Sequence, residues 1–168
     1  MSLFPTDILA EAEAILDLCR ARRLTLATAE SCTGGLIAAC FTEVAGASDV
    51  FERGFVTYSN RAKVEMLGVK PQTLKRFGAV SKETALEMAQ GALARANTDI
   101  AVAVTGVAGP GGGSADKPVG LVHLAISSSK FPLMHAKCQF GEIGRSDIRM
   151  LTLQQALQLT QKLLSQYA

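Results

Sequence analysis

The 168-residue chain has the length of about one domain, and its composition excludes several classes of protein. Hydrophobic residues make up 48% and charged residues 19%, as in folded domains rather than disordered chains. The net charge of +2 and the 5% of aromatic residues do not favour a nucleic-acid surface. No apolar run reaches the roughly 18 residues of a membrane span, and residues 1–23 do not resemble a secretory signal. We therefore expect a single cytoplasmic domain over residues 1–168, with no nucleic acid and no membrane as partner.

In chain order, the patterns predict alternating helices and strands. The first half shows a helix within 1–23 that opens at Pro5-Thr6-Asp7, a strand over 24–29, a helix over 35–44 and a strand over 51–58. One or two helical turns over 60–67, a short helix over 71–77 and a helix from the N-cap Ser81 to about Ala96 follow. The second half shows a strand over 100–105, strands over 119–127 and 133–140 that form a hairpin, and a closing helix over 145–167. This order predicts one α/β domain with a mixed sheet and helices on both faces.

Cysteine and histidine show no pattern of a metal or disulfide site. Reduced thiols are expected, because no CxxC pair occurs among Cys19, Cys32, Cys40 and Cys138. The two histidines, His123 and His135, lie in strand-like segments, whereas zinc sites usually have more His and Cys ligands at closer spacing. We expect no metal and no cofactor.

The segment Ser31-Cys32-Thr33-Gly34-Gly35 follows a predicted strand and precedes a predicted helix. The first N–H groups of a helix have no partner within the helix, so they can bind an anion or stabilise an oxyanion. The two glycines allow a ligand to approach the backbone closely. The structural alternative is a helix start that is capped by Ser31 or Thr33. The residues alone leave both interpretations open.

Ser31 is a candidate nucleophile without a histidine partner. It does not lie in a GxSxG elbow, and both histidines lie in predicted strands. A lysine whose pKa is lowered by burial can serve as the base instead. Residues 56–69 offer Lys63, one turn into a helix, and Tyr58, at the end of a strand. The plainer alternatives are a solvated lysine and an aromatic residue at the rim of a site.

Cys32 is a rival nucleophile. Glu30, Lys63 and Cys32 supply the residue types of a Glu-Lys-Cys arrangement, which can also hydrolyse amides. A small buried cysteine is the more common structural outcome.

A second Gly-rich segment, residues 105–120, follows the strand over 100–105. It lacks the G-x-x-x-x-G-K-[ST] pattern and suits a ligand wrapped by main chain, or else a flexible connection. Arg145 and Arg149 begin the last helix, where positive charge opposes the helix dipole. Their position indicates an anion such as phosphate, or else a pair of solvated charges.

Four segments, in this order, carry a resemblance to a known family: TAESCTGGLIAA, FERGFVTYSNRAKVEMLGV, GAVSKETALEMAQGAL and VAVTGVAGPGGGSADKPVGLVHLAI. From about residue 8 to its end, the chain resembles the CinA C-terminal domain family, which contains the nicotinamide mononucleotide (NMN) amidohydrolases. The resemblance implies a three-layer α/β/α single domain with a mixed, mostly parallel sheet. It implies hydrolysis of the carboxamide of NMN to nicotinate mononucleotide and ammonia, a step of pyridine-nucleotide salvage. Larger relatives carry an N-terminal nucleotide-pyrophosphatase-like domain. The 168 residues leave no room for that domain, so we expect the stand-alone form.

Position by position, the resemblance implies Ser31 as nucleophile, Lys63 as base and Tyr58 as a supporting hydroxyl. It implies a substrate pocket formed by Thr33, Gly34, Gly35, Asn60, Thr105, Gly106, Ala108, Gly109 and Arg145, with Arg145 on the phosphate or ribose. It also implies an oxyanion site at the N–H groups near residues 33–35. The segment FGEIGRSDIR departs from the Phe-x-Gly-Asp-Arg of many relatives, which lengthens the spacing to Arg145.

Two other functions stay open from the sequence. One is a cysteine amidase that uses Cys32. The other is a non-catalytic nucleotide-binding or regulatory module, associated with competence or DNA damage. We also expect a homo-oligomer, paired through apolar faces of the first and last helices.

Overall fold

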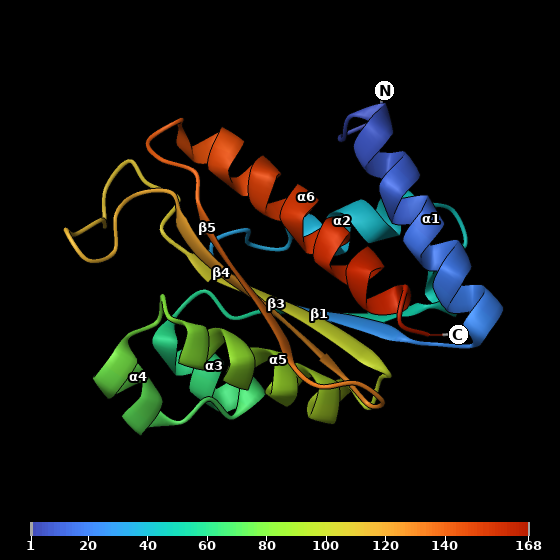
Figure 1. Ribbon diagram of the computed structural model, residues 1–168, viewed down its shortest axis with the longest axis horizontal. Coiled ribbons are helices and arrows are strands. Elements are labelled where there is room, and N and C mark those ends of the chain that lie inside the picture. The colour runs from blue at the N-terminus through green and yellow to red at the C-terminus, as the bar shows by residue number, and fades with distance from the viewer. Residues whose placement is uncertain (1, 168) are drawn as a thin grey trace.

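The computed structural model describes residues 2–167, and a five-stranded sheet lies at its centre (Figure 1). The strands are β1 Leu26–Glu30, β2 Phe51–Val56, β3 Ile100–Gly106, β4 Leu121–Ser128 and β5 Met134–Gln139. The helices are α1 Thr6–Arg22, α2 Leu36–Glu43, α3 Asn60–Leu67, α4 Pro71–Phe77, α5 Lys82–Ala96 and α6 Arg145–Leu164, with a 3₁₀ turn, η1, at Ala47–Asp49. The predicted order of elements is confirmed, with ends that shift by a few residues.

The sheet order is β2-β1-β3-β4-β5. β1 pairs in parallel with both β2 and β3, whereas β4 pairs antiparallel with both β3 and β5. Four of the five strands therefore run in one direction, which confirms the mixed, mostly parallel sheet and the hairpin of β4 and β5. The carboxyl ends of β1, β2 and β3 meet at one edge, where sites in such sheets form.

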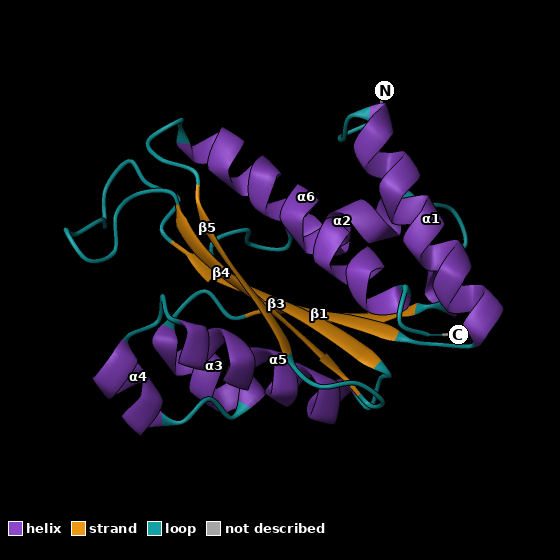
Figure 2. Ribbon diagram, viewed as in Figure 1, coloured by secondary structure: helices purple, strands orange, loops and turns teal. Residues whose placement is uncertain are grey.

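Helices cover both faces of the sheet, which confirms the three-layer α/β/α arrangement (Figure 2). On one face, Val102 and Val104 of β3 belong to the larger core, beneath α1, α2 and α6. On the other face, the same strand presents Ala101 and Ala103 to α5, because successive side chains of a strand point to opposite faces. The small alanines allow α5 to lie close to the sheet.

The apolar faces of α1 and α6 pack inside this chain. Ile8 and Ile15 of α1 and Leu153 and Leu163 of α6 belong to the same buried cluster. These faces are therefore not free to pair with a second copy, and this reason for expecting a homo-oligomer was wrong. Within residues 2–167, no helix has both the length and the apolar character needed to cross a membrane.

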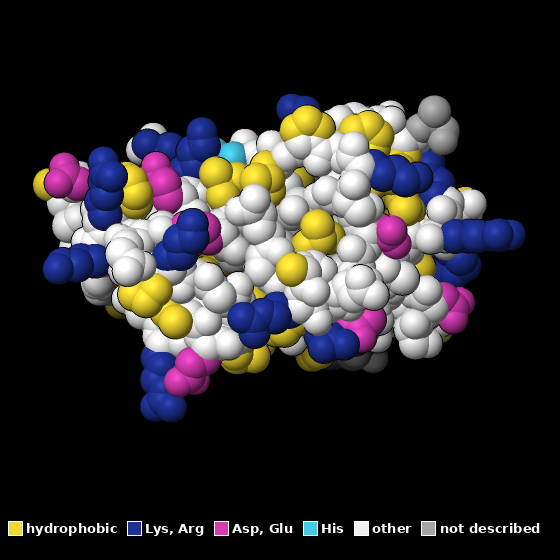
Figure 3. Space-filling view, turned by 90° about the horizontal axis from the view of Figure 1, so that it is seen from below, with side chains coloured by type: hydrophobic (Ala, Val, Ile, Leu, Met, Phe, Trp, Pro, Cys, Tyr) yellow, Lys and Arg dark blue, Asp and Glu magenta, His cyan; other side chains and the backbone are white. Residues whose placement is uncertain are grey.

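Charged side chains of both signs are interspersed on the face that carries α3, α4 and α5 (Figure 3). Hydrophobic side chains lie between them.

Gly91 of α5 marks a close approach to α3. A Cβ atom at Gly91 would overlap the carbonyl oxygen of Leu67, the last residue of α3. Because that oxygen belongs to the backbone, α3 would have to move. We expect Gly91→Ala to lower the free energy of unfolding in urea by about 1–3 kcal/mol, although alanine favours helix more than glycine does. The exposed neighbour Gln90 supplies the control: Gln90→Ala should leave the unfolding free energy nearly unchanged. Equal stability of Gly91→Ala and wild type would contradict this packing.

Candidate active site

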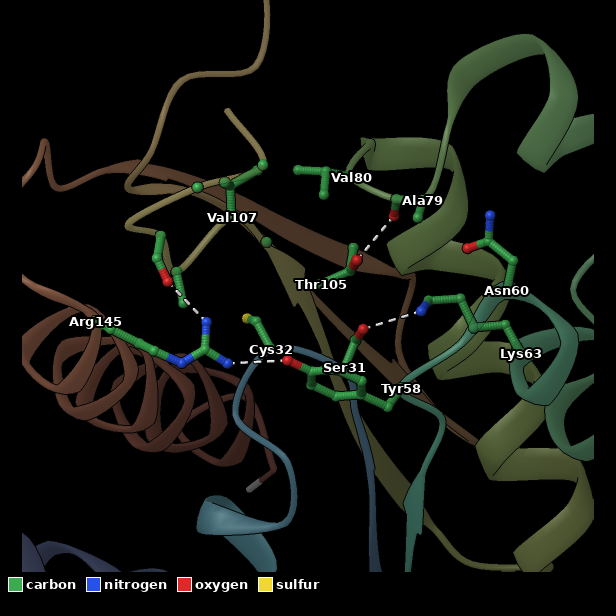
Figure 4. A pocket seen from close by; sticks show the side chains of 15 residues that line it. Ser31, Cys32, Tyr58, Asn60, Lys63, Ala79, Val80, Thr105, Val107 and Arg145 are labelled. Atoms are coloured by element: carbon green, nitrogen blue, oxygen red, sulfur yellow. Dashed lines mark hydrogen bonds between the residues drawn. The ribbon is translucent and has the colours of Figure 1, made fainter. Parts of the chain in front are cut away.

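A cavity of about 290 Å³ opens at the carboxyl ends of β1, β2 and β3 (Figure 4). Its walls come from the turn after β1, the β2–α3 connection, the α4–α5 connection, the Gly-rich loop after β3 and the start of α6. The lining residues are Ser31, Cys32, Tyr58, Asn60, Lys63, Ala79, Val80, Thr105, Gly106, Val107, Ala108, Gly109, Gly111, Gly112 and Arg145.

Ser31 and Lys63 form a hydrogen-bonded pair in this cavity. Lys63 Nζ lies 2.9 Å from Ser31 Oγ and also donates to the carbonyl oxygen of Thr57 at 3.0 Å. The Lys63 side chain is buried, with 1% of the residue exposed, and no ion pair among residues 2–167 includes it. Burial disfavours the charged ammonium and lowers the pKa of Lys63 to about 8. The alternative of a solvated lysine is therefore wrong, and a neutral amine is accessible near physiological pH.

Local sequence explains how Lys63 reaches Ser31. Ser59 caps α3, because its Oγ accepts a hydrogen bond from the N–H of Ala62 at 3.0 Å. Lys63 lies one turn inside the helix, and helical side chains lean back toward the N-terminus. This direction brings Lys63 to the end of β1, where Ser31 N donates to the carbonyl oxygen of Val104 at 3.1 Å.

Tyr58 lies at the rim of the cavity and is 60% exposed. Its hydroxyl accepts a hydrogen bond from Arg145 Nη2 at 2.9 Å, while Arg145 Nη1 donates to the carbonyl oxygen of Gly109 at 2.8 Å (Figure 4). These bonds join the β2–α3 connection to the Gly-rich loop across the mouth. The structure therefore gives Tyr58 the rim position, with its hydroxyl on Arg145 rather than on Ser31 or Lys63.

The two arginines of α6 have different surroundings. Arg145 is exposed and lines the cavity. Arg149 instead donates from Nη2 to the carbonyl oxygen of Thr33 at 2.8 Å, and it supports the turn after β1 from outside the cavity. Of these two arginines, Arg145 is therefore the one that is placed to meet an anion in the cavity.

Thr33, Gly34 and Gly35, which the resemblance implies as substrate contacts, do not line the cavity. The N–H of Gly34 donates to the carbonyl oxygen of Ser31 at 3.0 Å, and the N–H of Gly35 donates to Glu30 Oε2 at 3.1 Å. Neither group is free to stabilise an oxyanion. The structural alternative was also wrong, since no serine or threonine side chain caps α2.

The other expected pocket residues do line the cavity: Asn60, Thr105, Gly106, Ala108, Gly109 and Arg145. Thr105 donates its hydroxyl proton to the carbonyl oxygen of Ala79 at 2.8 Å, which ties β3 to the α4–α5 connection. That connection brings Ala79 and Val80 into the lining, and neither was predicted as a site residue. The sequence feature that could have indicated these two lining residues is the apolar Ala-Val pair directly before the N-cap Ser81.

Cys32 also lines the cavity but is a buried thiol, with 6% of the residue exposed. Burial raises the pKa of Cys32 to about 11, which disfavours the thiolate that a cysteine nucleophile needs. Among residues 2–167, no three His, Cys, Asp or Glu side chains are placed to hold a metal ion.

Fold and site together define an α/β/α domain with a serine that is hydrogen-bonded to a buried lysine at the carboxyl edge of its sheet. The chain belongs to the CinA C-terminal domain family, whose model matches residues 9–164.

Relatives of known name or structure resemble the chain closely. A nicotinamide-nucleotide amidohydrolase, PncC, from Enterobacter agglomerans is 52% identical over 77% of this chain and 80% of that protein. A competence/damage inducible protein, CihA, from Agrobacterium tumefaciens has a crystal structure with a TM-score of 0.95 and 55% identity, covering 99% of this chain and 100% of that one. A CinA superfamily protein from Escherichia coli has a TM-score of 0.89 and 35% identity, covering 97% of this chain and 94% of that one.

Several relatives are much longer than this chain. A CinA-like protein from Akkermansia muciniphila is 64% identical over 61% of this chain, and the match spans 25% of that protein. The match to a relative from Acetivibrio thermocellus spans 33% of that protein. The chain therefore spans about a third or less of the length of these relatives.

Proposed function

We propose that this chain hydrolyses the carboxamide of NMN to nicotinate mononucleotide and ammonia, with Ser31 as nucleophile and Lys63 as base. The observation that carries the proposal is the 2.9 Å hydrogen bond between Ser31 Oγ and the buried Lys63. The name of the Enterobacter agglomerans relative, a nicotinamide-nucleotide amidohydrolase, supports the choice of substrate. Such an activity would serve pyridine-nucleotide salvage in the cytoplasm.

In the proposed mechanism, neutral Lys63 takes the hydroxyl proton of Ser31 as Oγ attacks the amide carbon. The Lys63 ammonium then gives that proton to the leaving nitrogen, so the C–N bond breaks and ammonia departs. An ester on Ser31 remains. Water, activated by neutral Lys63, hydrolyses the ester to release nicotinate mononucleotide and restore the serine.

The oxyanion of the tetrahedral intermediate needs donors other than the N–H groups of Gly34 and Gly35. Among residues 2–167, the N–H group of Cys32 donates to no other residue, and Cys32 lines the cavity. Cys32 directly follows the nucleophile, a position that supplies an oxyanion donor in other serine hydrolases. We assign the oxyanion to this N–H group, which would contribute roughly 3–4 kcal/mol.

The size and charge of the cavity suit a mononucleotide. Its volume of about 290 Å³ lies near the lower end for ligand pockets, which favours a mononucleotide over a dinucleotide. The lining has two cationic side chains, Lys63 and Arg145, and no Asp or Glu among the described residues. The Arg145 guanidinium is placed to bind the phosphate, and the positive pyridinium ring itself activates the carboxamide.

Activity should depend on pH through Lys63. Because only the neutral amine accepts the proton of Ser31, we expect kcat/KM for NMN to rise with pH through a midpoint near 8 and then level off. Initial rates in a series of buffers on both sides of pH 8 test this. A rate that falls as pH rises through 8 would contradict a lysine base.

Cys32→Ala separates the serine mechanism from the cysteine alternative. We expect Cys32→Ala to keep kcat within roughly threefold of wild type, because the thiol is protonated and does not act. Ammonia release from NMN, with and without a chelator, is the measurement. We expect turnover in both conditions, and turnover lost only in Cys32→Ala would move the nucleophile to Cys32. NMN binding without ammonia release in wild type would support the non-catalytic module.

A further inference from the structure

Glu30, the last residue of β1, carries a buried carboxylate directly before Ser31. The residue is 0% exposed, and no ion pair among residues 2–167 includes it. Its partners are three backbone N–H groups at the start of α2. Oε2 accepts from Gly35 at 3.1 Å and from Ile37 at 3.0 Å, and Oε1 accepts from Ala38 at 2.8 Å.

These bonds close the turn after β1 into a ring. The chain leaves β1 at Glu30, passes through residues 31–34, and returns to the side chain of Glu30 at the start of α2. A carboxylate at a helix N-terminus is favoured by the helix dipole, and its bonds to N–H groups are charge-assisted. Because a buried charge without partners is unfavourable, the three bonds are what keep this carboxylate in the interior.

Ser31 is one of the residues of this ring, and backbone hydrogen bonds fix the chain at Ser31 and at Glu30. The carbonyl oxygen of Ser31 accepts from the N–H of Gly34 at 3.0 Å. The carbonyl oxygen of Glu30 accepts from the N–H of Thr57 at 2.8 Å, and the carbonyl oxygen of Thr57 accepts from Lys63 Nζ. Glu30 therefore contacts, through its side chain and its backbone, the segments that carry both members of the Ser31–Lys63 pair.

We propose that Glu30 is a positioning residue, whose carboxylate holds the turn so that Ser31 Oγ stays within hydrogen-bond distance of Lys63. It takes no part in proton transfer, because its oxygens are occupied by backbone N–H groups. The effect on turnover rests on the proposed function, but the effect on the reactivity of Ser31 does not. Misplacement of a reacting group by about 1 Å can lower a rate roughly 100-fold.

Glu30→Gln tests the proposal, because it keeps the shape of the side chain but turns one acceptor oxygen into a donor. The first readout is the rate at which phenylmethanesulfonyl fluoride labels Ser31, followed by mass spectrometry. In that reaction an Oγ–S bond forms, the S–F bond breaks, fluoride leaves and Lys63 takes the serine proton. The assay does not require NMN to be the substrate.

We expect Glu30→Gln to slow the labelling of Ser31 roughly 10- to 100-fold. The kcat for NMN should fall by the same factor, with KM within roughly threefold of wild type and the pH midpoint unchanged. The matched control is Glu87→Gln. Glu87 also accepts a backbone N–H at a helix start, that of Lys70 before α4, but it lies outside the cavity. Glu87→Gln should label at the wild-type rate.

Labelling of folded Glu30→Gln at the wild-type rate would overturn the proposal. A pH midpoint that falls by about one unit would also overturn it, because the carboxylate would then act on Lys63 through its charge.

If Glu30→Gln does not fold, Ala38→Pro decides instead. It removes one of the three donors in the first turn of α2, where proline is tolerated. Several-fold slower labelling is expected, and an unchanged rate would overturn the proposal. A wild-type protein that is labelled at Ser31 but does not hydrolyse NMN would contradict the proposed function and leave the role of Glu30 standing.

Discussion

Ser31→Ala is expected to abolish NMN hydrolysis, with a fall in kcat of roughly 10⁴- to 10⁶-fold. The variant lacks the oxygen that attacks the amide carbon, and water would have to replace it in a cavity arranged around Oγ. The measurement is the initial rate of nicotinate mononucleotide formation. The exposed serine Ser129 supplies the control, since Ser129→Ala should keep the wild-type rate.

The fold of Ser31→Ala should be intact, because the side chain is small and alanine fits its place. A folded Ser31→Ala variant that still turns over at more than a tenth of the wild-type rate would remove Ser31 from the mechanism. Simultaneous loss of activity in Cys32→Ala would point to the neighbouring thiol.

Lys63→Met is expected to lower kcat by at least roughly 10³-fold and, at the same time, to stabilise the protein. The folded state holds the pKa of Lys63 at about 8 instead of the usual 10.5, so the buried ammonium destabilises the folded chain below pH 8. Methionine fills a similar volume without the charge. We expect the free energy of unfolding at pH 7 to rise by about 1–3 kcal/mol, as measured in urea.

The sign of this effect can be checked against pH. Between pH 8 and 10.5 the unfolded chain binds the Lys63 proton more tightly than the folded chain does, so wild-type stability should rise with pH in this window. Lys63→Met should lack that rise. A variant that is less stable than wild type at pH 7 would show that the two hydrogen bonds of Lys63 Nζ outweigh the cost of burying its charge.

The fold was predictable because its signals are local. Apolar runs marked β1 and β3, Ser81 marked the start of α5, and the late adjacent strands marked the hairpin. The Gly-rich loops after β1 and β3 then indicated where the cavity lies, because parallel strands end at one edge of the sheet.

The site was predictable in its chemical types but not in its contacts. Lys63 lies one turn inside α3, the helix that follows β2, and this spacing was enough to suggest that its side chain reaches Ser31. The bond between Tyr58 and Arg145 joins residues far apart in the chain, and no local pattern encodes it.

The expected oxyanion site failed for a specific physical reason. Glycines at a helix start usually leave N–H groups free, but Glu30 folds its carboxylate back onto them. In the sequence, Glu30 reads as a charge that ends an apolar strand. Only its complete burial, together with its three backbone partners, identifies it as part of the turn that holds Ser31.

The covalent intermediate on Ser31 is tested most directly by the intact mass of the protein, measured after acid stops the reaction during turnover of NMN. We expect a mass increase equal to nicotinate mononucleotide less one water, located by peptide mapping on Ser31 and absent from Ser31→Ala. The same mass increase on the Cys32 side chain, or product formation in Ser31→Ala at the wild-type rate, would contradict it.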